Sequence, residues 1–424
     1  MANDSLYSVK LSEIWWYFKS QDILFWLINI YLFMEYVRPQ TLYPSLDVIP
    51  FTRIILIVTL VILLFKKYPL PKNISNTLII LFTIVIILSS MFAISPGVSF
   101  SKIYDYFAWV VIYFLIITII NTSERLFVFV FLFLVYSFKM SQFSFRNWVA
   151  SGFSFSDWGT GGGAGWFHNS GEFGIQMCVF LAVSCYFYYS LKDRWPWWKK
   201  GVFLLFPLTA LSGTISCSSR GALVGAGAVL FWMLLNSSHK IKGFVVLALV
   251  GVLVWHFTPS EQKERFRQAG KDKTSIQRTE RWEKGLRMAE RSPLLGVGYA
   301  NWEVADKRFF SGEGGLPHNI FIECISELGY SGFIVFILLI FSTFFNNYRT
   351  RKVLCRYDMK SSHLYYLAHG LDAALVGYLV SGYFVTVLYY PYFWINLSMT
   401  VALSSIVKAT NKDTAKLPIN CKIA

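Results

Sequence analysis

Residues 316–340 read LPHNIFIECISELGYSGFIVFILLI, and in this stretch a long polar segment gives way to an apolar one. His318 and Asn319 are followed by nine residues, then Gly329, two residues and Gly332, which gives the pattern H-N-x9-G-x-x-G. The apolar run has the roughly 20 residues that a helix needs to cross a bilayer. The stretch therefore predicts a membrane helix with a titratable imidazole at its mouth, where proton-transfer chemistry can occur at the bilayer surface.

The composition extends this interpretation to the whole chain. Of its 424 residues, 55% are hydrophobic and only 15% are charged, and the mean hydropathy is +0.48. A soluble domain carries about a quarter charged residues. Apolar runs recur along the whole length, so residues 1–424 are predicted to form a single all-α, polytopic membrane domain. Residues 1–20 resemble an interfacial helix rather than a cleavable signal peptide.

The apolar runs predict about twelve membrane spans. They are placed at residues 22–37, 50–65, 75–94, 104–120, 125–143, 168–190, 201–216, 220–236, 241–257, 318–345, 363–388 and 391–407.

The positive charge, +15 overall, is distributed unevenly between the two sides of these spans. With the N-terminus inside, 21 of the 39 Lys and Arg fall on inner segments, 6 on short outer segments and 12 in one long outer loop. Cytoplasmic loops collect Lys and Arg, and long loops escape this rule. The bias predicts that both termini are cytoplasmic, and it accounts for the charge without a nucleic-acid partner.

The long outer loop, residues 258–317 between the ninth and tenth spans, is predicted to be structured. Capping boxes begin at Thr258 and Thr274, and the second predicted helix ends before Pro293. An apolar strip is expected to dock this helix onto the membrane domain; it consists of Trp282, Leu286 and Ala289. A structured outer loop is where a membrane enzyme would hold its substrate.

His318 is the strongest candidate for a catalytic residue. Most interfacial histidines are only polar groups at the level of the lipid head groups, but at His318 a preceding proline, Asn319 and an arginine-rich loop converge. His168 serves as a comparison, because it too is followed by an asparagine, yet Val179 stands where the first glycine of the pattern would be.

Three arginines are candidates for binding an anion. Arg220 begins the eighth span, and Arg278 and Arg281 share one face of the predicted loop helix. Arginine is costly in a membrane, and its planar fork of donors fits a phosphate. A diphosphate held beside a general base is the functional interpretation. A snorkelling Arg220 and a solvated basic helix are the simpler alternatives.

Other motifs give weaker signals. The glycine-rich stretch 159–165 is expected to be a flexible loop rather than a phosphate cradle, since no P-loop lysine follows it. Glu323 and Glu327 would lie roughly opposite His318 on a straight helix, and Asp372 is either a proton-relay group or a packed polar contact. The six cysteines form no C-x-x-C pair and no Cys/His cluster is present, so neither a metal nor another cofactor is expected.

The order of these motifs resembles the bacterial O-antigen ligase and O-antigen polymerase superfamily. The resemblance is specific over residues 210–345: Arg220-Gly-Ala at a span start, Arg281-Trp282, the segment Pro293–Gly298, and H-N-x9-G-x-x-G. It implies a GT-C-like, metal-independent, inverting glycosyltransferase of the bacterial inner membrane with a periplasmic active site. By this resemblance His318 matches the catalytic histidine, and Arg220 and Arg281 match the pyrophosphate-binding arginines, with Arg278 competing for the second place.

The resemblance implies a glycan donor linked to undecaprenyl pyrophosphate. A ligase would transfer the glycan to a hydroxyl of lipid A–core, which is the preferred interpretation. A polymerase of O-antigen or exopolysaccharide would use another lipid-linked glycan, and a protein O-oligosaccharyltransferase would use a protein hydroxyl. A transporter of lipid-linked glycans is the non-enzyme alternative, but it predicts internal repeats and charges deep in the spans.

Overall fold

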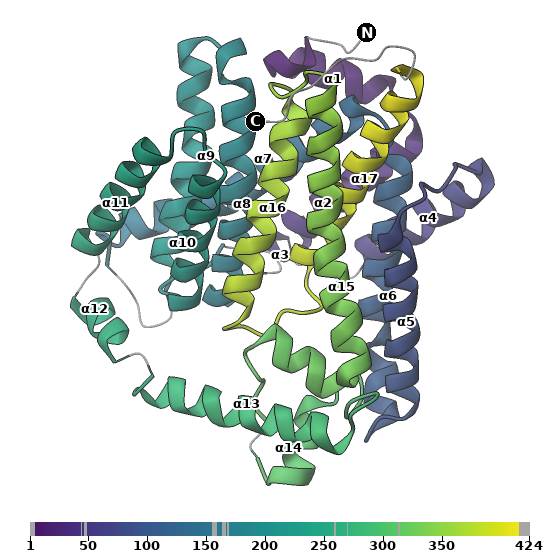
Figure 1. Ribbon diagram of the computed structural model, residues 1–424, viewed down its shortest axis with the longest axis vertical. Helices are drawn as coiled ribbons and strands as arrows, with labels where there is room; N and C mark the ends of the chain where they lie inside the picture. Colours follow the sequence, from purple (N-terminus) through teal and green to yellow (C-terminus); the bar gives the residue numbers. More distant parts are fainter. Residues whose placement is uncertain are drawn as a thin grey trace.

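In a computed structural model of the chain, residues 5–43, 45, 49–154, 159–162, 167, 169–257, 260–268, 270–312 and 314–414 are described. Over these residues the regular structure is entirely helical, without a strand (Figure 1). The predicted all-α class is confirmed. The helices are η1 Leu6–Ser8, α1 Leu11–Ser20, α2 Ile23–Tyr36, α3 Pro39–Leu42, α4 Phe51–Lys66, α5 Ile74–Met91, α6 Pro96–Ile119, α7 Ser123–Ala150, α8 Ser170–Leu191, η3 Lys192–Arg194, α9 Trp197–Ser216, α10 Arg220–Leu235, α11 Lys240–Phe257, α12 Ser260–Arg267, α13 Lys273–Arg291, α14 Trp302–Phe310, α15 Ile320–Arg356, α16 His363–Gly382 and α17 Pro391–Thr414.

Each of the twelve predicted spans contains one helix. In the described part of the chain, five helices are long and apolar enough to cross a membrane: α5, α6, α7, α8 and α15; α10 is a shorter apolar helix. The number twelve therefore stays a prediction. The largest difference in bounds is α15, which continues to Arg356 rather than ending near residue 345. The added turns are polar, and buried Asn346 and Asn347 find partners on neighbouring helices.

The loops that the charge bias assigns to the inner side gather at one end of the bundle. The Tyr7 hydroxyl lies 3.2 Å from Ser123 Oγ, which lies 3.3 Å from His363 Nε2, and Lys199 Nζ donates to the Ser8 carbonyl (2.7 Å). Helices α13 and α14 lie at the opposite end from α1 (Figure 1). These predicted inner segments and the predicted outer loop therefore lie at opposite ends of the bundle. Their placement relative to a membrane stays a prediction.

Small residues allow the central helices to approach closely. Helix α8 is largely buried and packs against α9, α10 and α16. A Cβ at Gly225 would clash with the Ser381 side chain, and one at Gly221 would lie 2.9 Å from Phe384 Cβ. The G-x-x-x-G of residues 221–225 therefore mediates close packing of α10 on α16.

Helix α15 is broken at Gly329, which has φ 66° and ψ −169°. The loop after α13 satisfies the backbone groups that the break releases: Val297 N–H donates to Ser326 O (2.9 Å), and Tyr330 N–H donates to Pro293 O (2.7 Å). A Cβ at Gly329 would lie 2.6 Å from the Leu294 carbonyl oxygen. The glycine of the motif is thus required twice, for its left-handed φ and for the close approach of the loop.

Helix α13 differs in two details from the sequence interpretation. Its N-cap is Asp272, whose carboxylate accepts from Ser275 N–H (2.7 Å), so the predicted capping box at Thr274 is wrong. The predicted docking strip is confirmed at Ala289, which is 1% exposed, but not at Leu286. Gly285 packs so tightly against Trp302 that a Cβ would lie 2.8 Å from the ring, whereas Leu286 is 46% exposed. Residues 258 and 259 of the other predicted box lie outside the described residues.

Candidate functional site

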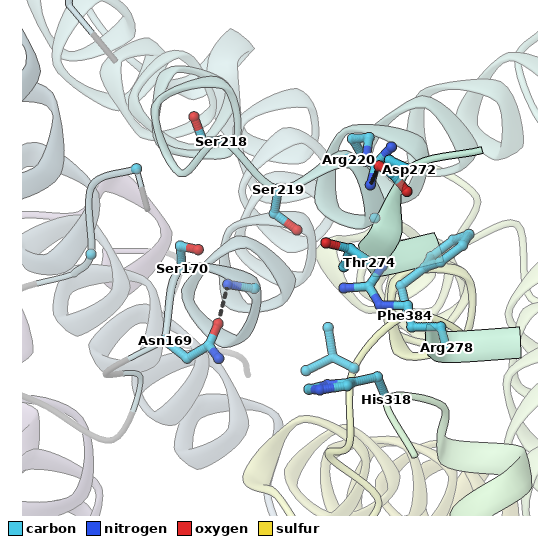
Figure 2. A pocket seen from close by; sticks show the side chains of 15 residues that line it. Asn169, Ser170, Ser218, Ser219, Arg220, Asp272, Thr274, Arg278, His318 and Phe384 are labelled. Carbon is cyan, nitrogen blue, oxygen red and sulfur yellow. Dashed lines mark hydrogen bonds and ion pairs between the residues drawn. The ribbon is translucent and has the colours of Figure 1, made fainter. Parts of the chain in front are cut away.

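A cavity of about 580 Å³ lies at the end of the bundle that carries α13. Its wall comes from Gly159, Gly161, residues 169–171, the start of α10, the first turns of α13, the loop before α15 and residues 384–385 (Figure 2). Its polar and charged side chains are Asn169, Ser170, Ser218, Ser219, Arg220, Asp272, Thr274, Arg278 and His318. The cavity therefore brings together three of the predicted site residues from distant parts of the chain.

His318 is fixed immediately before α15. Its φ of 51° turns the chain sharply, and its N–H donates to Thr386 Oγ1 (2.8 Å). Asn319 caps the helix, because its Oδ1 accepts from Phe321 N–H (2.8 Å) and Ile322 N–H (3.2 Å). The two residues thus have different roles: Asn319 caps the helix, and the imidazole of His318 lies in the cavity wall (Figure 2).

The electrostatic surroundings keep His318 neutral. Burial, with added repulsion from Arg278 and Arg281, lowers the pKa of the imidazole from 6.5 to about 4. At near-neutral pH the ring is therefore unprotonated. A neutral imidazole can accept a proton from a hydroxyl that enters the cavity.

Arg220 connects two elements at the cavity. It is the first residue of α10, whose N-cap Ser219 accepts from Ala222 N–H (3.3 Å). Its guanidinium lies 2.6 Å from the carboxylate of Asp272, the N-cap of α13. The arginine thus links the loop helix to the membrane domain, and both partners remain about one-fifth exposed toward the cavity.

Arg278 lies between Arg220 and His318 in the cavity wall (Figure 2). Its Nε is buried and finds no hydrogen-bond partner among the residues that the structure describes. Burial, followed by repulsion from Arg220, lowers the pKa of its guanidinium. A buried donor without an acceptor is unfavourable, so this position favours an anion that fills the cavity.

Arg281 does not line the cavity. Its Nη1 donates to the Leu316 carbonyl (3.2 Å), and neighbouring Trp282 donates from Nε1 to the Pro317 carbonyl (3.0 Å). Both bonds hold the chain immediately before His318. The structure thus separates the two competing arginines: Arg278 faces the cavity, and Arg281 supports the loop that carries the histidine.

Several cavity residues were not singled out from the sequence. Asn169 Oδ1 caps α8 by accepting from Gly171 N–H (2.7 Å), and Asp272 is the partner of Arg220. The available signals were the asparagine after His168 and an acidic residue beside a basic helix. Of the glycine-rich stretch, Gly159 and Gly161 line the cavity, whereas residues 163–165 and His168 lie outside the described residues.

The buried carboxylates lie elsewhere. Glu323 accepts from Leu388 N–H (3.2 Å), Glu327 accepts from Ala300 N–H (3.1 Å), and neither lines the cavity. Asp372 is ion-paired with Arg351, which favours the packed polar contact over the proton relay. In the described part of the chain, no three His, Cys, Asp or Glu side chains gather where they could hold a metal ion.

Comparison with known proteins gives two matches. Residues 202–337, which include Arg220, Arg278 and His318, match the family model described as O-antigen ligase. The exopolysaccharide production protein ExoQ of Rhizobium meliloti (strain 1021) is 29% identical over an alignment of 164 positions. That alignment covers 30% of this chain and 38% of the relative. Both matches support the O-antigen ligase and polymerase superfamily that the motifs predict.

Proposed function

We propose that this chain is an O-antigen ligase: a glycosyltransferase that moves a glycan from undecaprenyl pyrophosphate to a hydroxyl of lipid A–core. The observation that carries the proposal is the shared cavity of Arg220, Arg278 and His318. Two cations and a neutral base within one wall match the needs of a reaction with a diphosphate leaving group and an alcohol acceptor.

In this proposal the donor diphosphate occupies the space between Arg220 and Arg278. The unpartnered Nε of Arg278 supplies one donor. Arg220 can exchange Asp272 for a phosphate oxygen, because both side chains are accessible from the cavity. Guanidinium groups suit this role through their planar fork of N–H donors.

The chemical step needs no further co-reactant. The acceptor oxygen attacks the anomeric carbon of the donor sugar from the side opposite the diphosphate. A carbon–oxygen bond forms there as the bond to the diphosphate oxygen breaks, so the configuration inverts. The acceptor proton passes to the neutral imidazole of His318, and the electron pair of the broken bond stays on the diphosphate, whose charge the arginines stabilise.

Donor binding also improves the base. Arg278, one of the two arginines whose repulsion lowers the pKa of His318, would be neutralised in part by the bound diphosphate. The pKa of the imidazole then rises from about 4 toward the range in which proton acceptance is most effective. The site is thus expected to become competent as a base when the leaving group is in place.

Other motif residues position the site. Arg281 and Trp282 hold the loop before His318, and Asn319 starts the helix after it. Gly329 allows the break against which the α13–α14 loop packs, and Gly332 follows where a Cβ would meet the Leu328 side chain. Under the predicted topology this end faces the periplasm, so the donor would enter from the outer leaflet of the bacterial inner membrane, with both termini cytoplasmic.

A second candidate function is polymerisation of lipid-linked glycans. It is favoured by the relative whose name assigns it to exopolysaccharide production. The same diphosphate site and base would serve, and only the acceptor would differ: the sugar of another lipid-linked glycan in place of lipid A–core.

The two candidates can be separated in a deletion strain of the source bacterium. Loss of a ligase leaves long polymer on undecaprenyl pyrophosphate and bare lipid A–core. Loss of an O-antigen polymerase leaves lipid A–core with a single repeat. We expect the first pattern. The single-repeat band would identify the polymerase, and unchanged surface glycans would contradict both.

A further inference from the structure

A second cavity, of about 940 Å³, lies between α5, α15 and α17 at the other end of the bundle. His318 lies before the break of α15 at Gly329, and the continuous helix from there to Arg349 spans roughly 30 Å at a rise of ~1.5 Å per residue. The candidate catalytic residues make no part of this wall. Whatever binds here uses a site of its own.

Three cations line this cavity. Lys72 precedes α5, Arg349 belongs to α15 and Lys408 to α17. Among the described residues none of the three makes an ion pair. The Arg349 guanidinium lies over the Phe345 ring, 5.2 Å from its centroid. Three positive charges, from the segment before α5, from α15 and from α17, thus converge on one cavity without an acidic partner among the described residues.

The polar groups beside these cations form a built network. Asn346 Oδ1 accepts from Asn73 Nδ2 (3.0 Å), and Asn346 Nδ2 lies 3.2 Å from Ser75 Oγ. Asn73 also caps the 18-residue helix α5 through Ser75 N–H (3.0 Å). The partly positive N-terminus of α5 therefore adds to the field of the cations.

The remainder of the wall is apolar and open. Phe341 is 65% exposed and Leu338 44% exposed on α15, and Ile74 is 57% exposed on α5. Both helices are long and apolar enough to span a membrane. The cavity therefore combines a cationic region with an apolar surface that would face lipid tails, which is the pattern of an anionic amphiphile rather than of a soluble anion.

We propose that this cavity binds an anionic phospholipid, with the phosphate head group among Lys72, Arg349 and Lys408 and the acyl chains along α5 and α15. Under the predicted topology the lipid comes from the cytoplasmic leaflet, whose anionic lipids attract basic groups. The inference requires that α5 and α15 span the membrane, but it does not depend on the proposed glycosyl transfer.

The test is native mass spectrometry of the purified full chain in a neutral detergent. Phosphatidylglycerol and phosphatidylcholine with identical acyl chains are added to the wild type and to the variant Lys72→Ala/Arg349→Ala/Lys408→Ala. Removing each cation is expected to weaken the binding of phosphatidylglycerol about fivefold, so the triple variant should bind this lipid roughly a hundredfold more weakly than the wild type. The wild type should prefer phosphatidylglycerol over phosphatidylcholine.

A matched control removes three exposed cations on predicted inner segments outside the cavity, Lys66→Ala/Lys352→Ala/Lys360→Ala, and it should bind phosphatidylglycerol like the wild type. If the first variant does not fold, Arg349→Lys/Lys408→Arg should retain binding, and binding to the wild type should weaken as salt rises. Equal binding of the two lipids, equal loss in the control, salt-independent binding, or full competition by soluble glycerol phosphate would each overturn the proposal.

Discussion

Two arginine–aspartate pairs, Arg351–Asp372 and Arg220–Asp272, differ in how completely their hydrogen-bonding groups are satisfied. Asp372 is 1% exposed, and beside Arg351 it accepts from Asn347 Nδ2 (2.8 Å). Arg220 and Asp272 are each about one-fifth exposed and lie in a cavity wall beside a second arginine. The first pair is enclosed by its own helices, and the second faces space that another anion can enter.

This difference separates a structural charge pair from a candidate binding site. Removing one partner of an enclosed pair leaves a buried charge, so the cost falls on stability. Removing a cation from an accessible cavity leaves the fold intact, so the expected loss is in ligand affinity rather than in stability. The following predictions test this division, beginning with the largest effect.

His318→Ala is expected to lower glycan transfer by about 10²–10⁴-fold, because the acceptor loses its general base. The protein should remain folded, since the N–H bond to Thr386 does not involve the imidazole. The measurement is transfer by the purified variant from a lipid-diphosphate donor. His168→Ala, which changes the other His-Asn dipeptide, is the control and should be much milder; equal loss in both would remove His318 as the base.

Arg351→Ala should lower the free energy of unfolding by about 3–5 kcal/mol, because Asp372 would be left buried without its cation. Thermal unfolding in detergent would show a clear drop in Tm. The double variant Arg351→Ala/Asp372→Ala should recover part of the loss. A Tm like that of the wild type in the single variant would contradict the structural role.

Arg278→Ala should weaken donor binding by roughly 10–100-fold, the effect of one charged hydrogen-bonding group at about 1.5–3 kcal/mol. Arg278→Lys should recover only part of the lost donor affinity, since lysine keeps the charge but lacks the planar fork of N–H donors. The Tm should stay near that of the wild type, in contrast to Arg351→Ala. A clearly lowered Tm together with unchanged donor affinity would contradict the assignment of Arg278 to the ligand site.

Asp272→Asn should have the smallest effect, a gain of at most about fivefold in donor affinity. The change removes the anion that competes for Arg220, and an ion pair that solvent can reach contributes only about 0–1 kcal/mol. Asparagine is as good an N-cap as aspartate, so α13 should keep its start. Weaker donor binding would show that Asp272 assists the ligand rather than competing with it.

Local patterns predicted much of this molecule. Each of the twelve apolar runs contains a helix, and the spacing of His318, Asn319, Gly329 and Gly332 marked the loop–helix junction at which α15 begins. These features depend on neighbours within a few turns, which a single sequence displays.

Long-range pairing was not predictable. Nothing local shows that Asp272 meets Arg220 across 52 positions of sequence, or that Thr386 receives the N–H of His318. The choice between Arg278 and Arg281 depends on the rotation of α13, which Gly285 sets by packing against Trp302. Such contacts follow from tertiary packing, so the sequence provided the candidates and the fold arranged them.

The most direct test of the account is the pKa of His318 with and without a polyprenyl diphosphate, measured by NMR on ¹³C-histidine-labelled protein, with His318→Gln identifying the signal. Without ligand the pKa should lie near 4, below its usual value, because burial and the arginines disfavour the charged ring. With the diphosphate bound it should rise, so that the ring takes up a proton at higher pH. An unchanged pKa in the saturated complex would contradict a diphosphate held by Arg220 and Arg278 beside His318.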